Sequence, residues 1–222
     1  MNRPPVVSAE QWQTARDALL VKEKEHTHAL DALAAERRRL PMMRLGSHYR
    51  FTAPDGAKIG IGELFAGRRQ LVMYNFMRQP GEDWVCGGCA TFTDNLSPLT
   101  QPHLGARDTR LVLMSPAPQE EIEPLRRRMG WSVPWYSSDD DGDFYRDLGL
   151  GGLFALNVLL RDGDEYFRTY STTGRGVDRL RLDFNLLDLT PYGRQEAWED
   201  SPEGWPQTPT MQWLRPHDEY DS

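Results

Sequence analysis

Residues 71–77 form a near-continuous apolar run that is rich in side chains favouring β-structure. Such a run, without regular polar alternation, is typical of a central strand buried on both faces of a sheet. Two shorter apolar runs follow at 111–114 and 155–160, and segments with helical patterns lie between them. Strands that alternate with helices in this way predict parallel neighbours and a layered α/β fold.

Shorter patterns complete the predicted order of elements. They are, in chain order, a strand at 49–51, helices at 86–96 and 119–129, and an extended piece at 133–136. Asp162-Gly163 is a hairpin turn signal, so 166–170 is expected to return as an antiparallel edge strand before a last helix at 177–189. The order β–α–β–α–β–β–α predicts a mixed central sheet with helices on both faces, which is the thioredoxin-like layout.

A long helix is expected before this domain, from about Ala9 to Arg39. Ser8 and Gln11 have the spacing of a capping box at its start, and Pro41 ends it. Its apolar stripe is interrupted by polar residues, which is too weak a pattern for a coiled coil. We therefore expect this helical arm to lie on the main domain or on a second subunit.

The chain thus divides into three parts: a helical arm at 1–44, a thioredoxin-like domain at 45–190 and a tail at 191–222. The tail is rich in proline, tryptophan and acidic residues. It has an irregular pattern but is too aromatic to remain in solvent, so we expect it to pack on the domain.

Composition argues against two classes of partner. The 222-residue chain has a formal net charge of −7, whereas nucleic-acid binding requires a basic face. No apolar stretch approaches the ~20 residues that cross a bilayer, and the first residues lack the apolar segment of a secretory signal. We therefore expect a cytoplasmic protein without a nucleic-acid or membrane partner.

Two cysteines occur in the chain, three residues apart in Cys86-Gly87-Gly88-Cys89. They are expected where a central strand gives way to a helix, and the unpaired N–H groups there favour negative charge and lower the pKa of the Cys86 thiol. Cys89 lies about one helical turn later on the same face. The pair therefore predicts thiol–disulfide exchange, with Cys86 as nucleophile and Cys89 as resolving thiol.

Three residues before the pair are supporting candidates. Trp84 could form an apolar rim, and Glu82 or Asp83 could take a proton from Cys89 during resolution. As like charges, the same acids would raise the pKa of a thiol and oppose the helix dipole. The sequence leaves open which effect is larger.

Two other uses of a CxxC pair are less well supported. Purely structural disulfides are rare in the cytosol. The pair could supply half of a zinc site, but no second CxxC or nearby Cys/His pair completes it, and His103, the nearest histidine, would have to fold back. We therefore expect no metal and no organic cofactor.

Five longer stretches add to this interpretation: LLVKEKEHTHALDALAAERRRLP, YNFMRQPGEDWVCGGCATFTDNL, RRRMGWSVPWYSS, YFRTYSTTGRGVDRL and LLDLTPYGRQE. Together they resemble a bacterial thioredoxin-like family of unknown function that is often labelled a predicted dithiol–disulfide oxidoreductase or isomerase. The resemblance covers nearly the whole chain, from about Val7 to His217. It implies a thioredoxin-like fold, and it carries over Cys86 and Cys89 as redox residues.

Two features depart from these patterns. The stretch between Tyr145 and Ala155 is shorter than the family leads us to expect. Thioredoxins place a cis-proline before the strand that faces the CxxC, where it helps to dock a substrate backbone, whereas residues 151–155 here read Gly-Gly-Leu-Phe-Ala. A general protein-disulfide reductase is therefore less favoured.

The order of elements also resembles that of peroxiredoxins. FTAPDGAKIGIGELFAG, GWSVPWYSSD and LLRDGDEYF fit that family, whose peroxidatic cysteine would correspond to Cys86. Its Pro-x-x-x-Thr-x-x-Cys signature is broken, because Gln79 and Asp83 occupy the Pro and Thr positions. A thiol peroxidase is therefore the alternative enzyme.

The sequence thus predicts a thiol–disulfide oxidoreductase that acts on a protein or small-molecule thiol or disulfide and is recycled by a thiol reductant. A thiol peroxidase that forms a sulfenic acid at Cys86 remains an alternative. So does a non-catalytic thioredoxin-fold module for binding or redox sensing. A homodimer through the helical arm is a further expectation.

Overall fold

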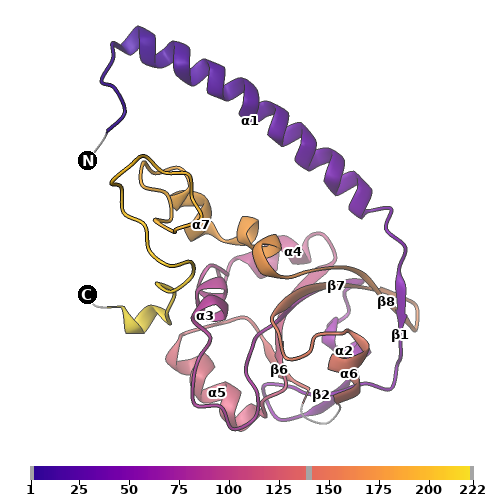
Figure 1. Cartoon of the computed structure of the whole chain (residues 1–222). Coiled ribbons are helices and arrows are strands. Elements are labelled where there is room, and N and C mark those ends of the chain that lie inside the picture. The colour runs from indigo at the N-terminus through magenta and orange to yellow at the C-terminus, as the bar shows by residue number, and fades with distance from the viewer. Residues whose placement is uncertain (1–2, 139–141, 221–222) are drawn as a thin grey trace.

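The computed structural model describes residues 3–138 and 142–220 (Figure 1). Within these residues one mixed sheet is formed by strands that lie in the order β1 (Met43–Leu45), β8 (Glu165–Thr172), β7 (Ala155–Asp162), β4 (Gln70–Asn75), β5 (Thr109–Ser115), β6 (Trp135–Ser137), β2 (Arg50–Thr52) and β3 (Lys58–Gly60). The pairs β4–β5 and β5–β6 are parallel, and the other neighbours are antiparallel. The predicted mixed central sheet is confirmed.

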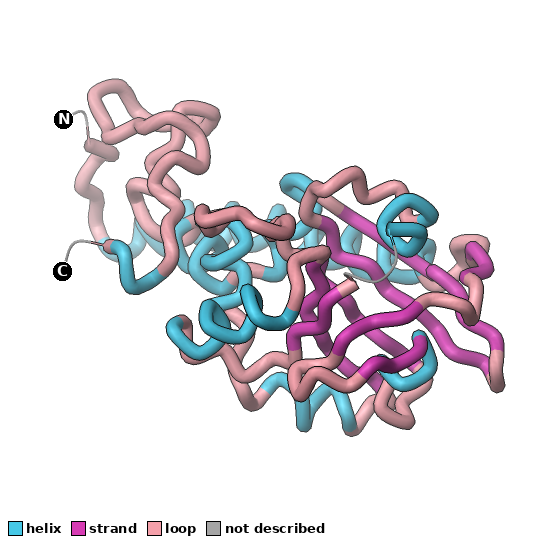
Figure 2. Tube along the Cα trace, turned by 90° about the horizontal axis from the view of Figure 1, so that it is seen from below, coloured by secondary structure: helices cyan, strands magenta, loops and turns pink. Residues whose placement is uncertain are grey.

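Helices lie on either side of the sheet, as Figure 2 shows from below. They are α1 (Ala9–Arg37), α2 (Ile61–Leu64), α3 (Gly87–Asp94), α4 (Thr100–Gly105), α5 (Gln119–Arg128), α6 (Gly142–Asp147) and α7 (Leu182–Leu187), with short 3₁₀ helices η1 (Gly174–Leu180) and η2 (His217–Glu219). In Figure 1, α3 and α5 lie on one side of the sheet, while α2 and α6 lie on the other.

The central strand β4 is buried on both faces because its side chains alternate between two apolar cores. Leu71 and Met73 belong to the core that includes residues of α2 and α6. Tyr74 and Phe76 belong to the opposite core, beneath α3 and α5. These four side chains are at most 1% exposed, and burying each contributes about 1.5–3 kcal/mol. The apolar run 71–77 therefore fixes the middle of the sheet.

The hairpin β7–β8 forms at the predicted Asp162-Gly163 turn, but β8 is not the edge of the sheet. The three-residue strand β1 pairs outside it, with Met43 opposite Arg168. The boundary that the sequence places between the arm and the domain, at 44/45, therefore falls inside a strand. Three residues are too few to show a period-two pattern, so β1 has no signal in the sequence.

The last predicted helix, 177–189, is not continuous, because Arg181 divides it into η1 and α7. Arg181 has extended backbone angles of φ −98° and ψ 116°, and η1 ends before it while α7 begins after it. Its side chain turns inward, is 2% exposed and stacks on Phe184 with its guanidinium carbon 3.5 Å from the ring centroid. The break thus places a paired cation inside the domain.

The N-terminal helix α1 begins as predicted. Ser8 and Gln11 form the capping box, with backbone-to-side-chain hydrogen bonds of 3.1 and 3.2 Å. The helix then projects away from the domain (Figure 1), and none of its residues is buried. The expectation that the arm lies on the main domain is therefore wrong, because the helix has too weak an apolar face to hold it there. A contact with a second subunit stays a prediction.

None of the helices in the described part of the chain has both the length and the apolarity to cross a bilayer.

Candidate functional site

The CxxC pair lies where a buried strand leads, through a loop, into a helix. Strand β4 ends at Asn75, and Cys86 is the N-cap residue of α3, with extended angles of φ −62° and ψ 110°. The Cys86 sulfur accepts a hydrogen bond from the backbone N–H of Cys89, with Sγ and N 3.3 Å apart. It thus takes the place of the side-chain oxygen that usually caps a helix N-terminus. The predicted strand-to-helix position is confirmed.

The pKa of the Cys86 thiol is lowered to about 7. The main cause is a hydrogen bond with the Cys89 thiol; burial opposes it, and the backbone N–H groups of Cys89 and Gly88 add to it. Cys86 is a buried residue with 9% of its surface exposed, and it lines a cavity. A cysteine that lines a cavity and has a thiol pKa near neutrality is suited to nucleophilic attack.

The pKa of the Cys89 thiol is shifted in the opposite direction to that of Cys86. Its residue is fully buried, and burial, followed by the neighbouring Cys86, raises its pKa well above that of a free cysteine. The sulfur accepts hydrogen bonds from the Tyr74 hydroxyl at 3.4 Å and from the backbone N–H of Met77 at 3.5 Å. The two sulfurs therefore ionise in sequence, Cys86 first.

Tyr74 contacts the Cys89 sulfur, which no motif in the sequence predicts. It projects from β4 into the core under α3, where its ring stacks on Phe92 with centroids 4.0 Å apart. Burial, with a contribution from Cys89, raises the pKa of its hydroxyl well above the usual value. Tyr74 is therefore a neutral donor that stabilises negative charge on the Cys89 sulfur.

Both cysteine residues belong to the lining of a cavity of about 230 Å³ with mainly apolar walls. The walls come from segments far apart in the sequence: Tyr74, Met77, Cys86, Gly88, Cys89, Phe92, Phe154, Gly174, Val177, Asp178, Arg181, Met211 and Leu214. Polar orienting groups in a small apolar cavity are the usual features of a small-molecule site.

The two charged residues in the cavity wall are already paired. Arg181 bonds Asp183, with Nη2 and Oδ2 2.5 Å apart. Asp178 bonds Arg194 at 2.9 Å and Arg175 at 3.4 Å. The wall therefore carries little net charge.

The three supporting candidates lie outside this cavity wall. Trp84 is 51% exposed. Glu82 accepts a hydrogen bond from the backbone N–H of Gln79 at 2.8 Å, and Asp83 is exposed. Neither acid is among the groups that shift the pKa of either thiol. The structure thus brings the two cysteines together without the residues before them.

Phe154 lies in the cavity wall and belongs to the stretch 151–155, which reads Gly-Gly-Leu-Phe-Ala. The peptide bonds of the described residues are all trans, and Gly151 and Gly152 have positive φ values of 52° and 81°. Only glycine adopts such angles without strain. The glycine pair therefore turns the chain so that Phe154 enters the cavity wall.

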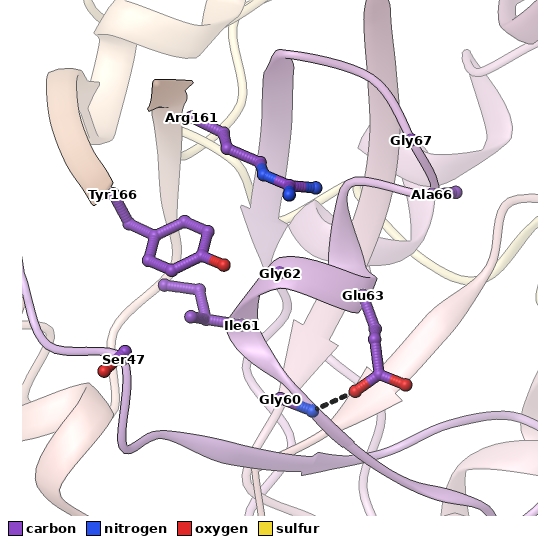
Figure 3. A pocket seen from close by; sticks show the side chains of 9 residues that line it. All are labelled: Ser47, Gly60, Ile61, Gly62, Glu63, Ala66, Gly67, Arg161 and Tyr166. Atoms are coloured by element: carbon purple, nitrogen blue, oxygen red, sulfur yellow. Dashed lines mark hydrogen bonds between the residues drawn. The ribbon is translucent and has the colours of Figure 1, made fainter. Parts of the chain in front are cut away.

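A second hollow lies away from the cysteines, between α2 and the β7–β8 hairpin. Figure 3 shows its lining: Ser47, Gly60, Ile61, Gly62, Glu63, Ala66, Gly67, Arg161 and Tyr166. Glu63 is engaged, since it accepts a 2.7 Å hydrogen bond from the backbone of Gly60 (Figure 3).

In the described parts of the chain, no group of three or more His, Cys, Asp or Glu side chains is placed to hold a metal.

Sequence reasoning missed Tyr74, Arg181, Met211 and Leu214 as parts of the site. Tyr74 carried a usable signal, because period-two alternation places it on the same face of β4 as Phe76, toward the helix that follows. Met211 and Leu214 carried none, since their approach to the cysteines depends on the path of the whole tail.

Comparison with solved structures reveals similarity at low sequence identity. A cysteine-to-serine mutant of PrxQ from Xylella fastidiosa is 10% identical, with 65% of this chain and 94% of that chain covered and a TM-score of 0.44. An uncharacterized thioredoxin-like protein from Porphyromonas gingivalis is 18% identical, with coverage of 59% and 80% and a TM-score of 0.43. A secreted disulfide oxidoreductase from Mycobacterium tuberculosis is 16% identical, with coverage of 60% and 91% and a TM-score of 0.39.

These similarities concern the fold alone. The long N-terminal helix and the mixed central sheet are as predicted. A search of curated proteins found no match. A family model matches residues 1–220 of the chain. The chain therefore belongs to DUF899, a family of bacterial proteins of unknown function.

Proposed function

We propose that this protein is a thiol–disulfide oxidoreductase that uses Cys86 and Cys89. The observation that carries the proposal is the asymmetry of the pair. Cys86 caps α3, keeps 9% of its surface exposed and has a lowered pKa, whereas Cys89 is fully buried with a raised pKa. This is the order that sequential attack and resolution require.

The proposed reaction has two steps. The Cys86 thiolate attacks one sulfur of a disulfide R–S–S–R′, the S–S bond breaks, and R′–S⁻ leaves and takes up a proton. Cys89 then loses its proton and attacks the Cys86 sulfur, which releases R–SH and leaves a Cys86–Cys89 disulfide. Two electrons pass from the dithiol to the substrate, and a thiol reductant must return them. No metal or organic cofactor takes part in this scheme.

Alkylation of the native, reduced protein by iodoacetamide tests the proposal. Only the thiolate reacts, so the rate at Cys86 is expected to rise with pH through a midpoint near the lowered pKa of about 7, compared with ~8.5 for free cysteine. Cys89 is expected to react only after denaturation. The rates are measured by quenching and peptide mass spectrometry. A Cys86 midpoint at or above that of free cysteine would contradict exchange chemistry and favour a binding module.

Tyr74→Phe is expected to slow the second step while leaving the first unchanged. The substitution removes the 3.4 Å hydrogen bond that stabilises negative charge on the Cys89 sulfur and keeps the ring that stacks on Phe92. We expect resolution of the mixed disulfide to slow about tenfold, in line with the loss of one hydrogen bond to a charged group. Rapid-quench trapping with mass spectrometry measures that step.

The alkylation rate of Cys86 is the internal control for Tyr74→Phe, because Tyr74 is not a hydrogen-bond partner of that sulfur. If the mixed disulfide resolves at the wild-type rate, Tyr74 has a packing role and no positioning role for Cys89.

A further inference from the structure

The C-terminal strap, which we define as residues 211–219, lies directly against the CxxC pair. A Cβ atom added at Gly87 would lie 2.2 Å from the backbone oxygen of Leu214. Real Cβ atoms do not approach an oxygen so closely. Gly87 therefore allows the strap to pack against the start of α3. A Cβ atom at Gly88 would lie 3.9 Å from both the Cys86 sulfur and the Leu214 side chain, so the strap passes beside Cys86.

Both ends of the strap are held. At its start, the buried carboxylate of Glu196 accepts hydrogen bonds from the backbone N–H of Met211 and the indole of Trp213, both at 2.8 Å. Near its end, Asp218 pairs with Arg128 of α5 at 2.7 Å. His217 also lies 2.8 Å from Asp94 of α3. The strap therefore crosses the site as a fixed segment and does not trail from the domain as a loose end.

The strap completes the cavity around the cysteines. Met211 and Leu214 form part of its wall together with Met77, Phe92 and Phe154. The volume of about 230 Å³ is below the ~300–1,000 Å³ of pockets for drug-sized ligands. With Arg181 and Asp178 both paired, the wall does not compensate the cost of burying an additional charge.

We propose that the strap restricts this site to small, uncharged organic disulfides with apolar substituents and excludes protein disulfides. The inference rests on the proposed function and adds the class of substrate. A protein disulfide brings its flanking backbone with it, and the strap occupies the surface on which that backbone would lie. A small R–S–S–R can enter the cavity, where the Cys86 thiolate displaces R–S⁻ and Cys89 releases the second R–SH.

Three probe disulfides test this class: dipropyl disulfide, oxidised glutathione and insulin. Each oxidises the reduced full-length protein, and mass spectrometry follows the conversion of the Cys86 and Cys89 thiols to their disulfide. The rate of this conversion is divided by the rate of the same disulfide with free dithiothreitol. We expect the normalised rate with dipropyl disulfide to be about tenfold higher than with oxidised glutathione, because glutathione carries charges into the apolar cavity. We expect it to be about a hundredfold higher than with insulin.

The failure of the inference and the failure of the proposed function give different results. If insulin or oxidised glutathione reacts as fast as dipropyl disulfide, exchange stands but the proposed substrate class is wrong. If none of the three forms the Cys86–Cys89 disulfide, the proposed function itself is wrong, and the substrate class with it.

Gly87→Ala tests the strap directly. The new methyl group must displace the Leu214 backbone, so the normalised rate with insulin is expected to rise about tenfold. Gly60→Ala is the matched control, since its Cβ would meet its nearest neighbours at 3.6 and 3.7 Å and it lies far from the cysteines. An unchanged insulin rate in a folded Gly87→Ala protein would overturn the role of the strap.

A second variant covers the case in which Gly87→Ala does not fold. Leu214→Ala removes part of the cavity wall and is expected to reduce the preference for dipropyl disulfide over oxidised glutathione. Leu189→Ala is its control, because Leu189 is 81% exposed and lies outside the cavity wall. Equal preferences in the two variants would contradict the inference.

Discussion

Replacing Cys86 with serine is expected to reduce the rate of disulfide exchange at least about 10³-fold, the scale seen when a catalytic nucleophile is lost. A serine hydroxyl is not ionised near neutral pH and cannot form the mixed disulfide. The buried Cys89 thiol does not substitute, because its residue has no exposed surface and its pKa is raised. Loss of the protein's own thiols in the presence of dipropyl disulfide, followed by mass spectrometry under single-turnover conditions, measures the effect.

Cys89→Ser is the matched variant, with the same chemical change one helical turn away. It keeps the Cys86 nucleophile, so the first step is expected to proceed and the second to stop. Mass spectrometry should then show one R–S group bound at Cys86, a species that accumulates and is released by dithiothreitol. Full turnover by Cys89→Ser, or retained exchange by Cys86→Ser, would contradict the assigned order of the two thiols.

Hydrogen peroxide separates the proposed enzyme from its alternative. A thiol peroxidase would oxidise Cys86 to a sulfenic acid faster with peroxide than with any disulfide. Asp83 occupies the position of the threonine in the peroxiredoxin signature, and its carboxylate is exposed. This position therefore has no hydroxyl to orient a peroxide. We expect the disulfide to be the faster oxidant.

The central strands could be predicted because each carries its own signal. The apolar runs at 71–77, 111–114 and 155–160 became β4, β5 and β7, with ends within two residues of the prediction. The CxxC position followed from β4 and from the helix after it. These features are local, so the sequence around each one is sufficient to define it.

The remaining features depend on contacts between distant parts of the chain. The break at Arg181 follows from the burial of its guanidinium against Phe184 and Asp183, which no local pattern reveals. Met211 and Leu214 form part of the cavity wall. The Glu196 carboxylate holds this segment through its hydrogen bond with the Met211 backbone. A pattern within one segment cannot show which other segment will cover it.

Glu196→Ala is expected to have the largest effect on the stability of the tail. The Glu196 side chain is 1% exposed and accepts hydrogen bonds from the backbone of Met211 and from the indoles of Trp198 and Trp213. Removing the carboxylate leaves three donors without their acceptor, at ~1–3 kcal/mol each. We expect a loss of about 3 kcal/mol or more in the free energy of unfolding, measured by tryptophan fluorescence in urea.

The pH dependence of this effect has a definite sign. Burial would raise the pKa of Glu196, but the Met211 N–H, the two indoles and Arg194 outweigh it, so the pKa of the folded protein is lowered. Stabilisation by the carboxylate is therefore present above the unfolded pKa of ~4.3. It is lost as the pH falls through the lower, folded-state pKa. The wild-type and Glu196→Ala stability curves should accordingly converge in acid.

Glu203→Ala is the control, because Glu203 lies in the same tail and is exposed; surface substitutions of this kind change stability by at most about 0.5 kcal/mol. If Glu196→Ala unfolds at the same urea concentration as Glu203→Ala, the carboxylate does not hold the tail. If it is destabilised as expected, the strap loses its anchor at Met211, and the normalised rate with insulin should rise as it does in Gly87→Ala. One buried carboxylate would then link the stability of the tail to access to the cysteines.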